Sequence, residues 1–291
     1  MKTPKVSVIM PAYNVEKYIE EAIESILGQS FKDFEFVILN DGSTDNTAEI
    51  IQKYANKDNR IKFINNKKNK GFIDSLNECL DVAQGEYIAK MDSDDISLPM
   101  RLEKQVMYLD THPDVGLVGV GFKTFGETDT EVIHPEVVGL ADFLRNCCTT
   151  IFMLRKEIID KNNIRFSPDC LYVEDYDFYV RFIRFSAIHN LQEILYLYRW
   201  HGNNISITQS KVQLENANKI RKNILNFLSN SQDIQKKIDL VINPPPIKVS
   251  KTKYYLFGFI PFLKIKQNGN KAKYYLFDVV PLLRKKIKDK L

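Results

Sequence analysis

Three carboxylates, Asp92, Asp94 and Asp95, stand within four positions just behind a short apolar run. Carboxylates this close repel one another, and a divalent cation that carries a phosphate would balance their charge. An Asp-x-Asp pair on an extended segment can direct one carboxylate to Mg²⁺ or Mn²⁺ and the other to a bound water or a ribose. We therefore expect a metal and phosphate site at Asp92 and Asp94, with Asp95 capping or orienting the loop.

The elements that must position this cluster alternate regularly over the first hundred residues. Apolar runs of strand length are separated by stretches in which apolar residues recur at helical spacing. These runs occupy residues 6–10, 34–39, 60–64 and 87–89. Such a βαβαβαβ order predicts an α/β fold with a mainly parallel sheet and helices on both faces. Ser43 or Thr44 is expected to cap the second helix, and Gly71 to open the third.

Three polar motifs follow the carboxyl ends of these expected strands: residues 13–14, 41–43 and 92–95. Ligands bind beyond those ends in open α/β sheets. Any one motif is equally well explained as a solvated loop, but three at one rim favour a binding site. Neither a GxGxxG nor a GxxxxGK[ST] motif is present, so metal rather than a glycine-rich loop is expected to hold the phosphates.

Five short motifs together carry a resemblance to a known family. They are Val8–Asn14, Asn40–Asp45, Asn69–Gly71 with Asn77, Gly85–Glu86 and Asp92–Asp95. In this order and spacing they resemble family 2 glycosyltransferases of the GT-A fold, over roughly residues 4–210. The resemblance implies a Rossmann-like sheet and transfer of a sugar from a nucleotide diphosphate donor, with inversion at the anomeric carbon. Asn40 departs from the pattern, because many relatives have aspartate there.

The resemblance also implies roles for individual residues. The donor-binding residues would be Pro11, Ala12, Tyr13, Asn14, Asp41, Lys90, Asp92, Ser93 and Asp94. Among them, Asp41 would accept a hydrogen bond from the base, and Lys90 would lie near the phosphates. Asp92 and Asp94 would form the metal and ribose site.

Glu174 and Asp175 come directly before a stretch with helical spacing. An inverting transfer needs one general base to take the proton of the attacking hydroxyl. The pair resembles the family's Glu-Asp motif, in which the aspartate is the usual base, so Asp175 is the expected base. The alternative is that both residues only complement the helix dipole. Asp177 is expected to pair with Arg181 at i+4 instead.

His201 lies in the segment Tyr198–Ser206, which is similar to the segment that closes the family's catalytic region. A histidine there could supply a further metal or phosphate contact. The alternative is a structural hydrogen bond beside Trp200. We expect a metal site built from Asp94, Asp92 and His201, filled by Mn²⁺ or Mg²⁺.

The charge of the chain is unevenly distributed. Residues 248–291 contain twelve lysine and arginine residues against Asp278 and Asp289, a balance of +10, which leaves −6 on the rest of a chain of net charge +4. This tail also holds a repeat, because Lys253–Lys266 matches Lys273–Lys286 at 8 of 14 positions. Aromatic and aliphatic residues bracketed by lysines suit the interface between lipid tails and anionic headgroups.

Several partner classes follow from these patterns. The tail is expected to hold the protein on an anionic membrane surface; packing on the catalytic domain and homo-oligomerisation are the alternatives. RNA-reading motifs are missing, so no nucleic-acid partner is expected. No run reaches the roughly 20 apolar residues of a membrane span, and the first apolar stretch is too short for a signal peptide. Four cysteines without CxxC spacing fit a reducing compartment. We expect a cytoplasmic protein, peripheral on the inner face of the membrane.

The expected organisation has four parts. They are a nucleotide-sugar-binding half at 1–98, an acceptor-binding half at 99–210, a helical segment at 211–243 and the basic aromatic repeat at 244–291. The expected function is a metal-dependent glycosyltransferase that moves a sugar from a UDP-sugar to a glycan or lipid-linked acceptor in bacterial surface polysaccharide synthesis. A sugar-phosphate nucleotidyltransferase and a non-catalytic sugar-nucleotide-binding module are the alternatives.

Overall fold

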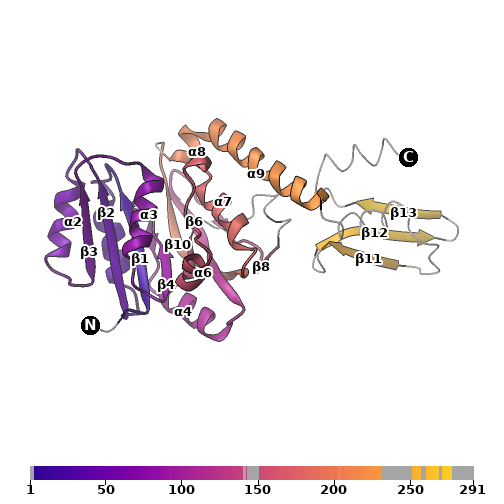
Figure 1. Cartoon of the computed structure of the whole chain (residues 1–291), viewed down its shortest axis with the longest axis horizontal. Coiled ribbons are helices and arrows are strands. Elements are labelled where there is room, and N and C mark those ends of the chain that lie inside the picture. The colour runs from indigo at the N-terminus through magenta and orange to yellow at the C-terminus, as the bar shows by residue number, and fades with distance from the viewer. Residues whose placement is uncertain are drawn as a thin grey trace. The chain divides into compact units, whose positions relative to one another are not determined.

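Figure 1 shows the structure, a computed structural model, coloured along the chain. It describes residues 3–139, 142, 151–202, 204–230, 251–256, 260–268 and 271–276. The chain divides into two compact units. The first comprises Met1–Val138 with Cys148–Asn216, and the second comprises Gly139–Cys147 with Ala217–Leu291.

The first unit is built on one mixed sheet, to which ten of the described strands belong. Its order is β3-β2-β1-β4-β9-β6-β10-β5, with β7 paired to β6 and β8 paired to β10. The strands are β1 Val6–Ala12, β2 Phe34–Asp41, β3 Ile61–Asn66, β4 Tyr87–Lys90, β5 Ile96–Ser97, β6 Val115–Gly126, β7 Glu131–Val132, β8 Val137–Val138, β9 Phe152–Arg155 and β10 Ala187–Trp200.

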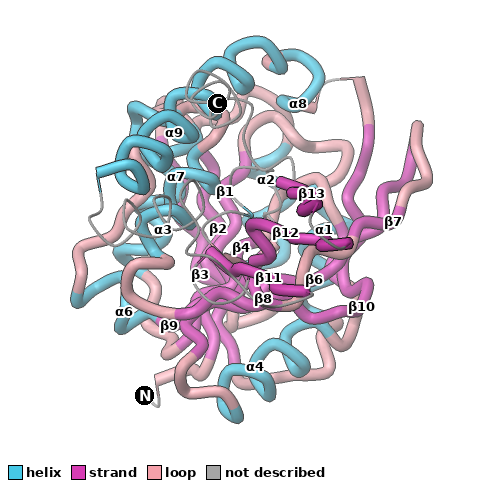
Figure 2. Tube along the Cα trace, turned by 90° about the vertical axis from the view of Figure 1, so that its right-hand side faces the viewer, coloured by secondary structure: helices cyan, strands magenta, loops and turns pink. Residues whose placement is uncertain are grey.

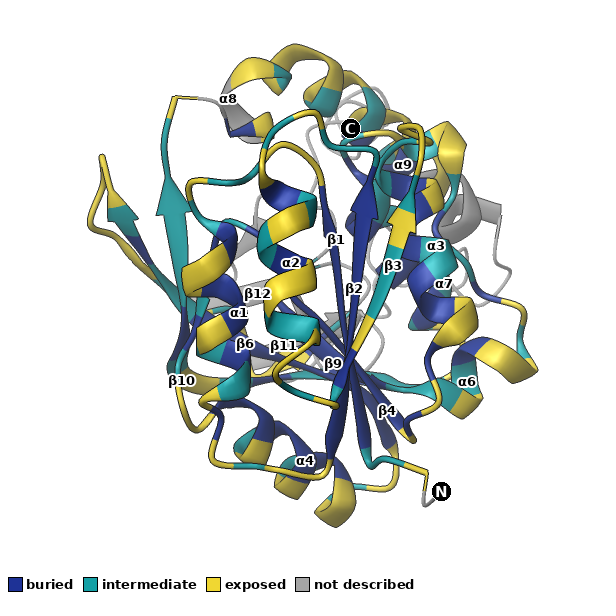
Figure 3. Ribbon diagram, turned by 90° about the vertical axis from the view of Figure 1, so that its left-hand side faces the viewer, coloured by how far each residue is buried: buried dark blue, intermediate teal, exposed yellow. Residues whose placement is uncertain are grey.

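The central strands β1 and β2 are buried along their whole length. They pair in parallel from Val6↔Phe34 to Ala12↔Asn40, and β1 also pairs in parallel with β4. Parallel strands covered on both faces are expected to be continuous apolar runs, which is how these segments read. The predicted parallel half of the sheet is confirmed (Figure 3).

Helices cover both faces of this parallel half. The described α-helices are α1 Ile19–Leu27, α2 Thr47–Ala55, α3 Phe72–Val82, α4 Arg101–Thr111, α6 Lys156–Lys161, α7 Glu174–Phe182, α8 Ile205–Thr208 and α9 Ser210–Asn230. Helices α1 and α2 contact each other in front of the sheet in Figure 3, and α3 packs on β1 and β2. Right-handed crossovers place α3 on the face opposite α1 and α2.

The predicted capping of α2 by Ser43 or Thr44 is wrong. The helix begins at Thr47, and the Thr47 backbone N–H donates to Asp45 Oδ1 at 3.0 Å. Ser43 Oγ instead accepts a hydrogen bond from the Asn14 backbone N–H at 3.0 Å. The Thr44 backbone N–H donates to Asn14 Oδ1 at 2.8 Å, so both residues serve the loop after β1.

Beyond β4 the sheet becomes mixed. Strand β9 lies between β4 and β6 and is antiparallel to both. The long strands β6 and β10 run parallel and side by side (Figure 2). Strand β10 carries the chain back to the carboxyl end of β4, where it pairs with the short strand β5 through Tyr196↔Ser97. Strands from residues 99–210 are thereby joined to the same sheet as the strands from residues 1–98.

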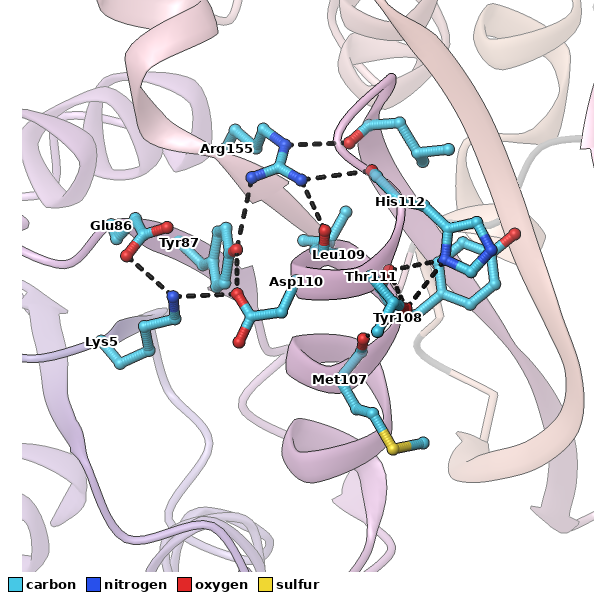
Figure 4. Close-up of polar contacts among 11 residues, drawn as sticks. Lys5, Glu86, Tyr87, Met107, Tyr108, Leu109, Asp110, Thr111, His112 and Arg155 are labelled. Carbon is cyan, nitrogen blue, oxygen red and sulfur yellow. Dashed lines mark hydrogen bonds and ion pairs between the residues drawn. The ribbon is translucent and has the colours of Figure 1, made fainter.

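A polar network closes the opposite end of the sheet, where β1 and β4 begin (Figure 4). Lys5 Nζ lies 2.8 Å from Glu86 Oε2 and 2.9 Å from Asp110 Oδ1. Tyr87 donates its hydroxyl hydrogen to Asp110 Oδ1 at 2.5 Å, and Arg155 Nη1 donates to Tyr87 Oη at 3.3 Å. The network ties β1, β4, α4 and β9 together.

The second unit contains the C-terminal repeat. Strands β11 (Lys251–Leu256), β12 (Ile260–Asn268) and β13 (Lys271–Leu276) form an antiparallel three-stranded sheet. The first repeat copy thus supplies β11 and most of β12, an arrangement that we did not predict. The expected helix over 211–243 is present as α9 as far as Asn230, and residues 231–250 and 277–286 lie outside the described residues. In the described part of the chain, the helices fall short of the length and apolarity of a membrane span.

Candidate active site

The loops after β1 and β2 are joined through Asn14. Its φ of 52° places it in the left-handed region, where asparagine is tolerated. Its hydrogen bonds to Ser43 and Thr44 bring together the first two motifs that the sequence singled out. The preceding residues end β1: Pro11 and Ala12 are buried, whereas Tyr13 is 46% exposed on the rim. The rim therefore offers an aromatic ring beside a fixed backbone turn.

Asp41, at the end of β2, holds a neighbouring loop. Its Oδ1 accepts from the Lys70 backbone N–H and its Oδ2 from the Gly71 backbone N–H, both at 2.9 Å. Gly42 has a φ of +68°, and a Cβ there would lie 2.6 Å from the Asn69 backbone nitrogen. The loop before α3 therefore packs directly on β2. The expected contact between Asp41 and the nucleotide base stays a prediction.

Lys90 links Asp92, in the third motif, to Asp175, the expected base. Lys90 Nζ lies 2.9 Å from Asp92 Oδ1 and 3.3 Å from Asp175 Oδ2, and the lysine side chain is only 3% exposed. Burial alone would lower the pKa of Lys90, but the charges of Asp175 and Asp92 outweigh it and raise that pKa. Lys90 is therefore a fixed cation between two carboxylates that stand 83 positions apart in the chain.

Asp175 stands in the first turn of α7, next to Glu174. Among the described residues its Oδ1 is buried and has no hydrogen-bond partner. Burial raises the pKa of Asp175, while the charge of Lys90 opposes that rise. Burial, and then the charge of Asp175, raise the pKa of Glu174 to about 7. Asp177, on the same helix, forms the predicted ion pair with Arg181 at 2.6 Å.

Asp94 and His201 form a second pair. His201 Nε2 lies 3.2 Å from Asp94 Oδ2, and the imidazole stacks on Tyr18 with ring centroids 5.2 Å apart. The His201 backbone N–H donates to Asn204 Oδ1 at 2.5 Å, which fixes the turn behind it. Burial and the charge of Asp92 raise the pKa of Asp94, and the hydrogen bond from His201 opposes the rise. Ser93, between the two carboxylates, is buried.

Two residues that we did not predict, Tyr196 and Arg199 of β10, hold the acidic loop in place. Arg199 donates its backbone N–H to Asp95 Oδ1 and its Nε–H to the Asp94 carbonyl, each at 2.7 Å. The Asp92 backbone N–H donates to Tyr196 Oη at 3.2 Å. Asp95 is 1% exposed, and burial followed by the charges of Asp94 and Asp92 raises its pKa. Tyr196 and Arg199 lie shortly before His201 in the sequence, and that proximity is the signal by which they could have been found.

Asp94 and His201 could provide part of a cation site. Within the described part of the chain, no group of three His, Cys, Asp or Glu side chains is placed to hold a metal ion. Asp94 and His201 nevertheless supply a carboxylate oxygen and an imidazole nitrogen side by side. Mg²⁺ and similar ions commonly take one or two protein ligands and complete their shell with phosphate oxygens and water. The Asp94–His201 pair fits that arrangement, whereas Asp92 is paired with Lys90.

Comparison with known proteins identifies the family. The model described as "Glycosyl transferase family 2" matches residues 7–177. An uncharacterized glycosyltransferase of Haemophilus influenzae is 34% identical over 250 residues, which cover 81% of this chain and 77% of that protein. The O-antigen biosynthesis glycosyltransferase WbnJ of Escherichia coli is 34% identical over 207 residues, which cover 68% of this chain and 80% of that protein.

Solved structures share the fold. S. aureus TarS 1–349 in complex with UDP aligns with a TM-score of 0.65 at 24% identity, over 82% of this chain and 70% of that one. The mannosyltransferase PcManGT of Pyrobaculum calidifontis, in complex with GDP-Man and Mn²⁺, aligns with a TM-score of 0.58 at 17% identity, over 84% of this chain and 71% of that one. The chain belongs to glycosyl transferase family 2 and is a glycosyltransferase, similar to enzymes of bacterial polysaccharide biosynthesis.

Proposed function

We propose that the protein transfers a sugar, with inversion, from a UDP-sugar to a glycan or lipid-linked acceptor of a bacterial surface polysaccharide. The E. coli relative named for O-antigen biosynthesis supports the pathway class. The S. aureus structure named as a complex with UDP supports the donor class. The observation that carries the proposal is Asp175 Oδ1, a buried carboxylate oxygen without a partner among the described residues.

Asp175 supplies the general base. An acceptor hydroxyl within hydrogen-bond reach of Oδ1 gives up its proton to that oxygen as the hydroxyl oxygen bonds to the anomeric carbon. The bond from the anomeric carbon to the diphosphate oxygen breaks on the opposite face, and the nucleoside diphosphate leaves with the bonding electrons. Lys90, 3.3 Å from Asp175 Oδ2, favours the ionised carboxylate that this step requires.

Asp94 and His201 would hold Mn²⁺ or Mg²⁺, which when bound neutralises the charge that develops on the leaving diphosphate. Pro11, Ala12, Tyr13, Asn14 and Ser93 would line the nucleotide pocket. Asp92 would orient the ribose while it remains paired with Lys90. The Mn²⁺ named in the Pyrobaculum structure supports a metal in this fold.

The base is tested with a pair of variants on one helix. Asp175→Asn should abolish transfer and leave the affinity for UDP nearly unchanged, because the amide cannot take the proton. Asp177→Asn is the matched control, since Asp177 pairs with Arg181 and is expected to leave turnover within about twofold of wild type. Wild-type turnover in Asp175→Asn would remove this residue from the mechanism.

The donor and the metal are tested with one screen. Thermal stabilisation and hydrolysis are measured for UDP-, GDP-, dTDP- and ADP-sugars with and without Mn²⁺. A UDP-sugar that stabilises the protein only with the metal would support the proposal. Release of pyrophosphate from a nucleoside triphosphate and a sugar phosphate would point to a nucleotidyltransferase. Binding without any turnover would point to a non-catalytic module.

We further propose that the C-terminal sheet holds the protein on an anionic membrane surface. Its register pairs Lys251 with Lys266 and Lys266 with Lys273, so lysines lie opposite one another. Residues opposite one another across strands share a face. Lys253 likewise pairs with Lys264, whereas Lys264 pairs with Tyr275 on the other neighbouring strand. Like charges in rows are unfavourable until an anionic partner compensates them.

Vesicle binding tests this second proposal on the full chain. Wild type should bind vesicles of phosphatidylserine and phosphatidylcholine and leave them as NaCl increases. Lys264→Glu with Lys266→Glu, both on β12, should release the protein. Lys32→Glu with Lys57→Glu, which change two exposed lysines of the first unit by the same charge, are the control. Equal release in both double variants would show a net-charge effect and refute a specific role of the C-terminal sheet.

A further inference from the structure

The resemblance implied a place near the phosphates for Lys90, yet the structure pairs its ammonium with two carboxylates. We propose that Lys90 is a positioning residue: it holds Asp175 Oδ2 so that Oδ1 alone is left to receive the acceptor proton. The inference rests on the proposed role of Asp175 as the base. It adds a direct mechanical link between the donor loop, through Asp92, and that base.

Lys90 is well placed for this role because its backbone is fixed on two sides. It is the last residue of β4 and pairs with Ile9 of β1. Arg101, which is fully buried, donates from Nη2 to the Lys90 carbonyl at 2.6 Å. The ammonium also lies 5.9 Å from the centroid of the Phe72 ring. A cation held this firmly sets the position of whatever it binds.

The charges around Asp175 also require a cation at the position of Lys90. Lys90 is the cation that opposes the rise in its pKa, whereas the charge of Asp92 adds to that rise. Glu174 is a second acidic neighbour in the same helical turn. Without the ammonium, Asp92 and Asp175 would face each other as like charges, and Asp175 would hold its proton at higher pH. A protonated Asp175 cannot act as a base.

The sequence offers a matched control for a purely structural role. Lys5 also bridges two carboxylates, those of Glu86 and Asp110, at distances of 2.8 and 2.9 Å. It does so at the other end of the sheet (Figure 4). Lys5→Met and Lys90→Met therefore remove the same kind of contact, and only the second touches the proposed base.

The experiment measures kcat, KM and the pH dependence of kcat for wild type, Lys90→Met, Lys90→Arg and Lys5→Met. The donor is the nucleotide sugar that supports the highest wild-type turnover. Lys90→Met should lower kcat about a hundredfold, change the donor KM less than about threefold, and move the acid limb of the profile to higher pH. Lys90→Arg should recover part of the lost kcat, and Lys5→Met should keep the wild-type profile.

The variants of Lys90 and Asp175 distinguish failure of the positioning role from failure of the base. Wild-type kcat and acid limb in Lys90→Met, with Asp175→Asn inactive, would overturn the positioning role and leave the base intact. An active Asp175→Asn would instead overturn the base, and the inference with it. If Lys90→Met does not fold, Lys90→Gln, which removes the charge but keeps a hydrogen-bond donor, decides: an unchanged acid limb together with unchanged kcat in that variant would reject the positioning role.

Discussion

His201 Nε2 lies 3.2 Å from Asp94 Oδ2, although the two residues are 107 positions apart. Strand β10 makes this meeting possible, because it ends at Trp200 and pairs with β5, which begins at Ile96 just after the acidic loop. The ring of Tyr18 then fixes the orientation of the imidazole. Residues 1–98 and residues 99–210 thus contribute one side chain each to the proposed cation site.

Removing either side chain of this pair should abolish metal binding and leave the protein folded. His201→Ala and Asp94→Asn are expected to abolish the additional thermal stabilisation that Mn²⁺ gives in the presence of UDP. Both variants should remain folded in the absence of metal, because each residue is partly exposed. His112→Ala, outside the site, should retain the full Mn²⁺ effect. Thermal unfolding with and without the ion measures all three.

Glu174 should make stability depend on pH. Its pKa is raised from 4.5 to about 7 by burial and by Asp175, so the folded state binds more protons between those values. The stabilisation is fully present below pH 4.5 and is lost as the pH rises through 7. Glu174→Gln should therefore flatten the decline of Tm across this interval, whereas Glu49→Gln, an exposed change, should not. An unchanged slope in Glu174→Gln would contradict the raised pKa.

Gly42→Ala should destabilise the loop before α3. The residue has a φ of +68°, and its new Cβ would lie 2.6 Å from backbone atoms of Lys68 and Asn69. The expected loss is about 1–3 kcal/mol of unfolding free energy, with increased amide exchange at Lys70 and Gly71. Gly202→Ala is the control, because a Cβ there meets nothing within 4 Å.

Tyr87→Phe should weaken the sheet without affecting the chemistry. The hydroxyl donates to Asp110 and accepts from Arg155 at the end of the sheet away from the site. Without the hydroxyl, the Asp110 carboxylate lacks one hydrogen-bond donor. The expected loss is about 1–3 kcal/mol of unfolding free energy. Denaturant unfolding checks the value, and kcat per folded molecule should equal that of wild type. Tyr54→Phe, whose hydroxyl bonds exposed glutamates, should cost less.

The parallel half of the fold was predictable because its strands are continuous apolar runs. Strand β9 was not, since it has only four residues and its partners β4 and β6 are distant in sequence. Strand β10 was also missed. Its register with β6 shifts three times, which disturbs the alternation by which a half-buried strand is recognised. Local patterns therefore predicted the secondary structure of residues 1–98 better than that of residues 99–210.

The sequence singled out candidate site residues but not the pairs that they form. Asp92, Asp94 and Asp175 were singled out from charge, spacing and resemblance. That Lys90 joins Asp92 to Asp175, while Asp94 pairs with His201, depends on how β4, α7 and β10 meet in space. The backbone bonds of Asp41 were equally unreadable, because they involve a loop 29 positions away.

Strand β9 restricts the large motions that the sheet allows. Rotating the first hundred residues as one lobe against the rest would break the pairs Tyr87↔Arg155, Ile88↔Leu154 and Ala89↔Met153. These pairs are internal to the sheet and largely buried, so such an opening would expose apolar core. Any rearrangement at the site that keeps these pairs intact must therefore come from the loops at the edge of the sheet, not from rotation of one part of the sheet against the other.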